Sequence, residues 1–146
     1  MEFLFRTFTD TDLLEYRAWF EDEELNRRLS YPDDIWFRHV RKPENACWAV
    51  IDDANRLIAV LQVDRKETTG YLDIALRPDL RRHGLGTAVL GGFLEGPGHA
   101  YDVIEGRISP GNAAAHALVR RCGFSILPDP DEDGFIRAAR PNLSPE

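Results

Sequence analysis

The run Arg81-Arg82-His83-Gly84-Leu85-Gly86-Thr87 constrains the fold more than any other part of this chain. It follows the mostly apolar segment Tyr71 to Leu76, which predicts a strand, and it precedes residues with helical spacing. The two glycines permit a tight turn and leave no Cβ to block a ligand. Amides at the start of the following helix would form an anion site, which the helix dipole strengthens. The run therefore predicts a strand–turn–helix unit suited to a pyrophosphate.

A second motif lies downstream, where Asn112-Ala113-Ala114-Ala115-His116-Ala117-Leu118 leads to Gly123-Phe124. The asparagine opens a short helix, and Gly-Phe closes it about three turns later. Together with Arg81-x-x-Gly84-x-Gly86, this pattern resembles the GNAT superfamily of acyl-CoA-dependent N-acyltransferases. The first run is similar to the family's pyrophosphate-binding motif, and the second is similar to its pantetheine-binding helix. The resemblance covers the chain from about Cys47 to Phe135.

The resemblance implies an α/β fold with a central mixed, twisted sheet of about six to seven strands and helices on both faces. Hydrophobic spacing predicts the same order: strand, two helices, three strands, helix, strand, helix and two strands. A further short helix is expected to start at Asp33 or Asp34. The predicted strands span about 2–8, 46–51, 57–63, 71–76, 100–108, 124–127 and 135–139. The other helices are expected near 10–20, 22–29, 85–95 and 111–122.

With 146 residues, the chain is expected to be one domain spanning 1–146. Apolar residues make up 43% and charged residues 29%, as in ordinary soluble proteins. We expect no membrane span, because no apolar run approaches about 20 residues. We also expect no signal peptide, because the first residues lack its basic-then-apolar layout. Cys47 and Cys122 lack metal-ligand spacing, which favours a reduced cytoplasmic protein without a metal. The net charge of −7 argues against nucleic-acid binding.

Charge is unevenly distributed along the chain. Cations gather at Arg81, Arg82 and His83, and again at Arg120 and Arg121. A basic cofactor pocket facing an acidic rim would suit an anionic cofactor and a cationic amine acceptor. Alternatively, the acidic runs are solvated faces. Acids crowd the first helical region and a late loop: Asp10, Asp12, Glu15, Glu21, Asp22, Glu23, Glu24, Asp129, Asp131, Glu132 and Asp133.

The resemblance also implies a set of cofactor contacts for acetyl-CoA. In the family, the strand before the glycine loop splays from its neighbour, and its free backbone pairs with pantetheine. Asn112 would reach a pantetheine amide, and it could also cap the helix that follows. The implied cofactor residues are Ile74, Ala75 and Leu76 on the strand, Arg81, Arg82, His83, Gly84, Leu85, Gly86 and Thr87 at the loop, and Asn112.

Acyl transfer needs a neutral amine and a proton for the departing thiolate. Many family members supply that proton from a tyrosine seven residues after the asparagine, where this chain has Val119. The variant pattern resembles the branch that acetylates the N-termini of ribosomal proteins. His116, four residues after Asn112, is a candidate proton donor, although packing is the favoured interpretation. Cys122 is a candidate nucleophile, but a buried cysteine at a helix end is the favoured interpretation.

Asp73 is the best candidate for the catalytic base. It interrupts the apolar run from Tyr71 to Leu76, where an unpaired carboxylate would be costly to bury. Some family members place a carboxylate on this strand close to the incoming amine. The alternative is a structural acid paired with Arg65 or Arg77.

The sequence thus predicts an N-acetyltransferase that moves an acetyl group from acetyl-CoA to a primary amine by direct transfer in a ternary complex. The acceptor would be a small-molecule amine or a peptide N-terminus. The alternatives are an aminoglycoside or other antibiotic N-acetyltransferase, and a non-catalytic acyl-CoA-binding regulatory domain. The resemblance is also compatible with a homodimer.

Overall fold

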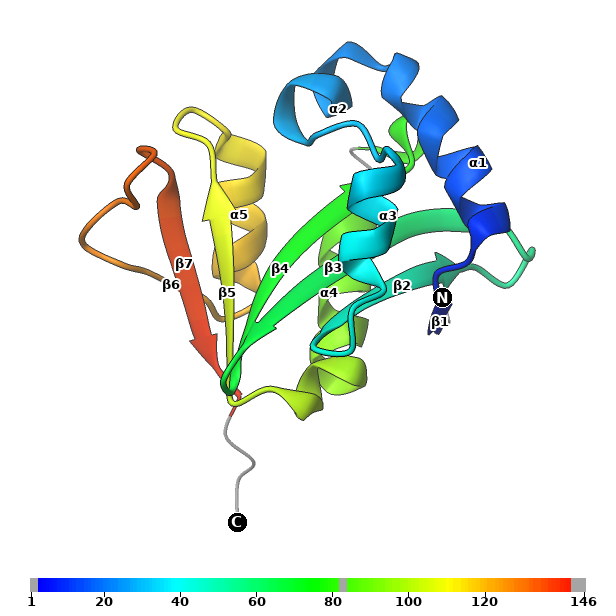
Figure 1. Ribbon diagram of the computed structural model, residues 1–146. Coiled ribbons are helices and arrows are strands. Elements are labelled where there is room, and N and C mark those ends of the chain that lie inside the picture. Colours follow the sequence, from blue (N-terminus) through cyan, green and yellow to red (C-terminus); the bar gives the residue numbers. More distant parts are fainter. Residues whose placement is uncertain (1–2, 82–83, 143–146) are drawn as a thin grey trace.

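A single mixed sheet forms the centre of the molecule (Figure 1). The computed structural model describes residues 3–81 and 84–142. The seven strands of this part of the chain lie in the order β1-β2-β3-β4-β5-β7-β6. They are β1 (Leu4–Thr7), β2 (Asn45–Ile51), β3 (Leu57–Lys66), β4 (Thr69–Leu76), β5 (Val103–Ile108), β6 (Ser125–Ile126) and β7 (Ile136–Pro141).

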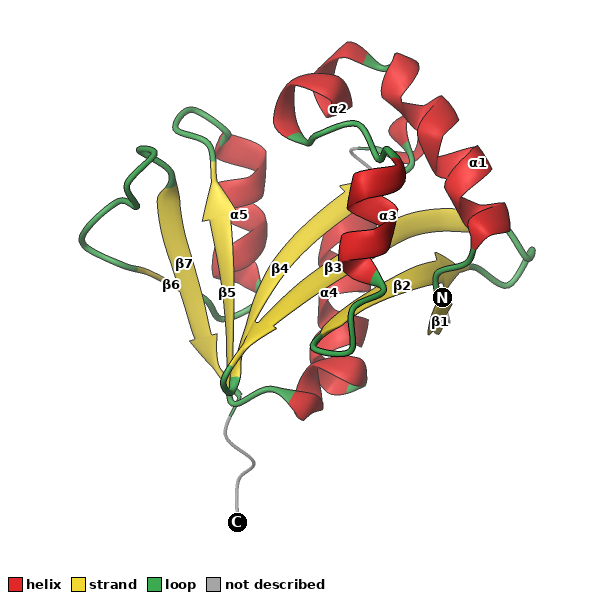
Figure 2. Ribbon diagram, viewed as in Figure 1, coloured by secondary structure: helices red, strands yellow, loops and turns green. Residues whose placement is uncertain are grey.

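Most of the helices begin where a short polar side chain can accept a hydrogen bond from the first turn. Thr9, Asp22, Asp33 and Asn112 each accept from a backbone N–H two or three residues into the helix that follows. Figure 2 shows the helices in red against the yellow sheet. They are α1 (Asp10–Ala18), α2 (Glu23–Arg28), α3 (Asp34–Val40), α4 (Leu85–Glu95) and α5 (Ala113–Arg121).

Two apolar clusters cover the two faces of the sheet. One joins α4 and α5 to the sheet through buried side chains such as Phe93, Leu90 and Ile104. The other joins α1, α2 and α3 to the opposite face through Tyr16, Leu25 and other residues. The predicted α/β architecture with helices on both faces is therefore confirmed.

Some boundaries differ from those predicted, and local backbone geometry explains them. The strand expected from residue 100 begins at Val103, because Pro97–Ala100 forms a 3-10 turn. The strand expected from Tyr71 begins at Thr69, because a two-residue turn already joins β3 to β4. That turn places Glu67 in the left-handed region, with φ of 57°.

The last four residues of β4 leave one side of the strand unpaired. The parallel ladder between β4 and β5 runs only from Thr69↔Val103 to Leu72↔Gly106. From Asp73 to Leu76, β4 pairs with β3 alone within the described residues. Figure 1 shows β4 and β5 diverging into a V beyond this point. Backbone groups on the β5 side of residues 73–76 are therefore available to another extended chain.

Candidate active site

The start of α4 lies close to the open end of this V. Gly84 caps the helix with φ of +73°, a left-handed conformation that favours glycine. The amides of Leu85, Gly86 and Thr87 lack an intrahelical partner because they belong to the first turn, and no side chain among the described residues caps them. Such amides, together with the helix dipole, attract an anion. Arg82 and His83, which were predicted as further cofactor contacts, lie outside the described residues.

Gly86 also allows close packing between three elements. A Cβ at this position would lie 3.3 Å from both Leu118 of α5 and Leu76 of β4. That separation is tighter than ordinary van der Waals contact, so α4 approaches its neighbours because residue 86 has no side chain. The second glycine therefore sets the position of the helix start relative to β4.

Replacing Gly86 by valine is expected to lower the free energy of unfolding by about 1–3 kcal/mol, because the added methyls press on Leu76 and Leu118. Thermal unfolding would measure the change. Gly91→Val is the matched control, since Gly91 lies in the same helix and a Cβ there meets no atom within 4 Å. Equal melting temperatures for the two variants would refute this packing role.

Arg81 is directed toward α2. Its Nη2 atom forms an ion pair with Asp22, and its Nε atom lies 3.1 Å from Oε2 of Glu24. The hydrogen bond from Arg81 holds the pKa of Asp22 below its usual range. The cation expected to face a pyrophosphate thus has two carboxylate partners in the structure.

Asp73 lies where the V begins, at the first residue after the β4–β5 ladder ends. Its side chain is exposed, and it has no hydrogen bond or ion pair with any described residue. Surrounding protein raises the pKa of Asp73, the negative charge of Asp64 raises it further, and Arg107 opposes both. The carboxylate is therefore open to a ligand and more basic than an ordinary aspartate.

The two arginines considered as structural partners of Asp73 contact other groups. Arg65 donates to the carbonyl oxygen of Ala100 at 3.1 Å, and its guanidinium lies 4.4 Å from the centroid of the Tyr101 ring. Arg77 forms an ion pair with Asp79 at 2.9 Å. The structure thus gives no support to the ion-pair interpretation of Asp73.

A polar network lies on β3 beside Asp73. Gln62, which is the register partner of Asp73, accepts a hydrogen bond from Nε1 of Trp36 at 2.8 Å. Its amide nitrogen donates to Asp64 at 3.1 Å, and Nε2 of His39 lies 2.7 Å from the other oxygen of that carboxylate. Side chains from α3 therefore hold the β3 polar groups in place next to the V.

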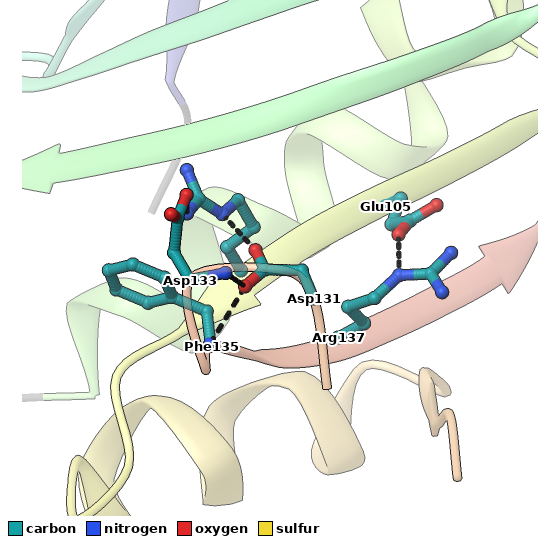
Figure 3. Close-up of polar contacts among 6 residues, drawn as sticks. Glu105, Asp131, Asp133, Phe135 and Arg137 are labelled. Atoms are coloured by element: carbon teal, nitrogen blue, oxygen red, sulfur yellow. Dashed lines mark hydrogen bonds and ion pairs between the residues drawn. The ribbon is translucent and has the colours of Figure 1, made fainter. Parts of the chain in front are cut away.

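A second polar cluster occupies β5 and β7, and sequence reasoning missed it (Figure 3). Glu105, which is buried, accepts a hydrogen bond from Nε of Arg137 at 2.7 Å. Arg107 forms ion pairs with Asp131 at 2.6 Å and Asp133 at 3.2 Å. Polar residues at alternate positions 105 and 107 of an otherwise apolar strand were the available signal.

Several acids of the two acidic runs have internal partners, which limits their part in attracting an acceptor. Asp131 and Asp133 pair with Arg107. In the N-terminal run, Asp12 is buried and lies 2.7 Å from Nη1 of Arg6. These acids serve local structure at least in part, so the runs are not simply free negative surface.

At α5, the structure shows one of the two roles considered for Asn112. Its Oδ1 accepts the N–H of Ala115 at 3.3 Å, which makes it the helix cap, while its side-chain nitrogen has no partner among the described residues. That nitrogen remains available to a ligand. His116 is half-buried and makes no side-chain hydrogen bond within the described part of the chain. Pantetheine binding by Asn112 and proton donation by His116 stay predictions.

Neither cysteine has the surroundings of an activated nucleophile. Burial raises the pKa of Cys122, although Arg140 and Arg121 partly oppose it. Burial also raises the pKa of Cys47 strongly. Both thiols are therefore held in the protonated, weakly nucleophilic form at neutral pH.

Residues 3–81 and 84–142 contain neither a metal-binding cluster nor a membrane-spanning helix. No group of three or more histidine, cysteine, aspartate or glutamate side chains is placed there to hold a metal ion. Within the same residues, every helix is too short or too polar to cross a membrane.

Solved structures with the same architecture include several N-acetyltransferases. A spermidine N-acetyltransferase from Vibrio cholerae, in complex with CoA and spermine, has 13% identity and a TM-score of 0.78, covering 96% of this chain and 95% of that chain. A ribosomal-protein alanine N-acetyltransferase from Escherichia coli has 20% identity and a TM-score of 0.74, covering 99% and 97%. A Campylobacter jejuni N-acetyltransferase in complex with acetyl coenzyme A has 12% identity and a TM-score of 0.74, covering 96% and 99%. At these identities, the likenesses show the fold alone.

Sequence comparison identifies the family. No curated protein matches the sequence. The sequence model of the Acetyltransferase (GNAT) family matches residues 13–124, a span that includes β4, the glycine loop and α5. Because this match covers most of the chain, the protein belongs to the GNAT family of acyl-CoA-dependent N-acetyltransferases.

Proposed function

We propose that this protein transfers the acetyl group of acetyl-CoA to a primary amine, with the donor bound in the V between β4 and β5. The observation that carries this proposal is the edge of residues 73–76, which lies next to the start of α4; within the described residues, β5 does not pair with this edge and no side chain caps the helix start. Pantetheine would pair with the backbone of Ile74, Ala75 and Leu76, as an added strand does. The pyrophosphate would accept from the amides of Leu85, Gly86 and Thr87.

The reaction in this proposal is a direct transfer. The neutral amine attacks the thioester carbonyl carbon, a C–N bond forms, and the C–S bond breaks as CoA leaves as a thiolate. Asp73 takes the proton released by the amine, directly or through a water molecule. The thiolate takes a proton from water, which is tolerable because a thiol with a pKa of about 8.5 is a fair leaving group.

The acceptor in this proposal is a cationic small-molecule amine or a peptide N-terminus. Three carboxylates support this choice, because Asp64, Asp73 and Glu105 lie on the adjacent strands β3, β4 and β5 and share one face of the sheet. Asp73 alone has no partner within the described residues. An ammonium group could therefore bind to it before losing a proton.

Turnover with a panel of amines would test the proposal. The purified protein is incubated with acetyl-CoA and a polyamine, an aminoglycoside or a peptide with a free N-terminus, and thiol release and acceptor mass are both recorded. The same peptide with a blocked N-terminus is the control. Binding of CoA without acetylation of any acceptor would contradict the proposed transfer, and absence of CoA binding would overturn the donor site as well.

Replacing Cys122 by alanine is expected to leave kcat within about twofold of the wild-type value, because a direct transfer has no acyl-enzyme. Steady-state kinetics and intact-protein mass spectrometry would check this. Cys47→Ala, at the other thiol, is the comparison variant. Loss of activity in Cys122→Ala, with an acetylated cysteine trapped in the wild type, would establish a two-step mechanism instead.

A further inference from the structure

An ion-pair cluster links α2 to the residues that lead into the glycine loop. Arg81 lies three positions before Gly84, and its partner Asp22 lies 59 positions earlier in the chain. The second partner, Glu24, is in the first turn of α2. The side chains are partly buried, with exposed fractions of 25% for Arg81, 29% for Asp22 and 35% for Glu24.

The carboxylate of Asp22 is held in place by its own helix. The Oδ2 atom that contacts Arg81 also accepts the N–H of Leu25 at 3.0 Å, so it caps α2 at the same time. Around this contact, the N-terminal helices and the turn at Pro78–Leu80 are separated by an open cavity of about 430 Å³, lined in part by Trp19, Asp22 and Pro78. Beside this cavity, the ion pairs of Arg81 with Asp22 and Glu24 bridge the two segments.

We infer that Arg81 is a positioning residue, which fixes the start of the glycine loop by binding Asp22 and Glu24 instead of binding phosphate itself. This inference rests on the proposed acyl-CoA site. If Arg81 turned toward a pyrophosphate, Asp22 and Glu24 would lose their cation and would face an incoming polyanion. We call the ion pairs of Arg81 with Asp22 and Glu24 the Arg81 clamp. While both ion pairs are formed, the guanidinium neutralises both acids and fixes the position of residue 81, from which the chain leads to the α4 amides.

The clamp also connects the helices on the two faces of the sheet. Helix α2 packs with α1 and α3 on the sheet face that carries Asp73, whereas α4 lies on the opposite face. A contact between α2 and the residues before α4 therefore joins the two layers at the end of β4. Loss of these ion pairs should lower the affinity for acetyl-CoA. The kcat at saturating acetyl-CoA should stay unchanged, because Asp73 is not affected.

Removal of the two acids distinguishes a clamp from a phosphate ligand. CoA affinity should fall if Arg81 is a clamp, and it should rise if Arg81 binds phosphate. The variants are Asp22→Asn with Glu24→Gln, Arg81→Gln, and all three together. Asparagine can still cap α2. Glu21→Gln with Glu23→Gln is the matched control, since both are exposed neighbours and the pair loses the same two charges. Calorimetry measures CoA affinity, and thermal unfolding checks that each variant folds.

A clamp predicts that the acid double variant and Arg81→Gln each weaken CoA binding, by about three- to tenfold, and that the triple variant is no weaker. KM for acetyl-CoA should rise with kcat preserved. KM for S-acetyl-pantetheine, which lacks the pyrophosphate, should not change. Tighter CoA binding in the acid double variant, alongside weaker binding in Arg81→Gln, would make Arg81 a phosphate ligand and overturn the inference. Unchanged affinity in both would also overturn it, whereas a wild type that fails to bind CoA would refute the proposed donor site instead.

Discussion

Replacing Gly84 by valine is expected to reduce CoA affinity at least about tenfold. A side chain at φ of +73° costs about 1–2 kcal/mol, which would push the backbone away from the conformation that presents the first amides of α4. A Cβ at Gly84 meets no atom of residues 3–81 or 84–142 within 4 Å, so the valine would project into space beside those amides that these residues leave open. Each lost hydrogen bond to a charged phosphate is worth about 1.5–3 kcal/mol. Calorimetric titration with CoA would measure the loss.

Gly134 provides a matched control for this variant. It has φ of +86° and equally open space around its Cβ, but it lies in the loop between β6 and β7. Gly134→Val should therefore show a similar loss of thermal stability with CoA affinity kept near the wild-type value. If both valine variants bind CoA as tightly as the wild type, the start of α4 is not the pyrophosphate site.

Local signals in the sequence predicted the helices well, and also the order in which helices and strands follow one another along the chain. Thr9, Asp22 and Asp33 cap helices near the predicted starts, and Gly123 takes the left-handed conformation expected just after α5. These features depend on a few neighbouring residues, and they hold whatever the tertiary contacts are. The strand, the turn at Gly84 and the following helix were predicted equally well, because they depend on local backbone conformation.

Side-chain contacts between segments far apart in the sequence could not be predicted from these local signals. Arg81 was expected to face an anion because its neighbours in sequence are basic, yet its partners come from α2. Arg107 likewise finds Asp131 through the pairing of β5 with β7. Neither pairing leaves a periodic pattern, because side-chain ion pairs depend on the register and twist of the finished sheet. The surroundings of Asp73, which determine its pKa, are non-local for the same reason.

Replacing Asp73 by asparagine is expected to lower kcat by about 10²-fold or more, because an amide cannot accept the amine proton. The surrounding protein and Asp64 raise the pKa of Asp73, so the wild-type rate should fall as pH drops through a value above about 3.9, the usual value for aspartate. This acid limb should be absent in Asp73→Asn. In Asp64→Asn the limb should move to lower pH, because the charge that raises the pKa of Asp73 is gone. A series of kcat measurements from low to neutral pH would test all three proteins.

The stability of the Asp73→Asn variant is the matching control, because the direction of the pKa shift determines how Asp73 affects folding at each pH. A carboxyl group whose pKa is higher in the folded state than in the unfolded state favours folding only at low pH, and that contribution is lost as pH rises through the folded value. At neutral pH the charged Asp73 therefore adds nothing to stability, and Asp73→Asn should unfold at the wild-type temperature or above it. A variant that keeps full kcat but melts earlier would identify Asp73 as a structural acid. Low kcat with unchanged melting would place the carboxylate in the reaction.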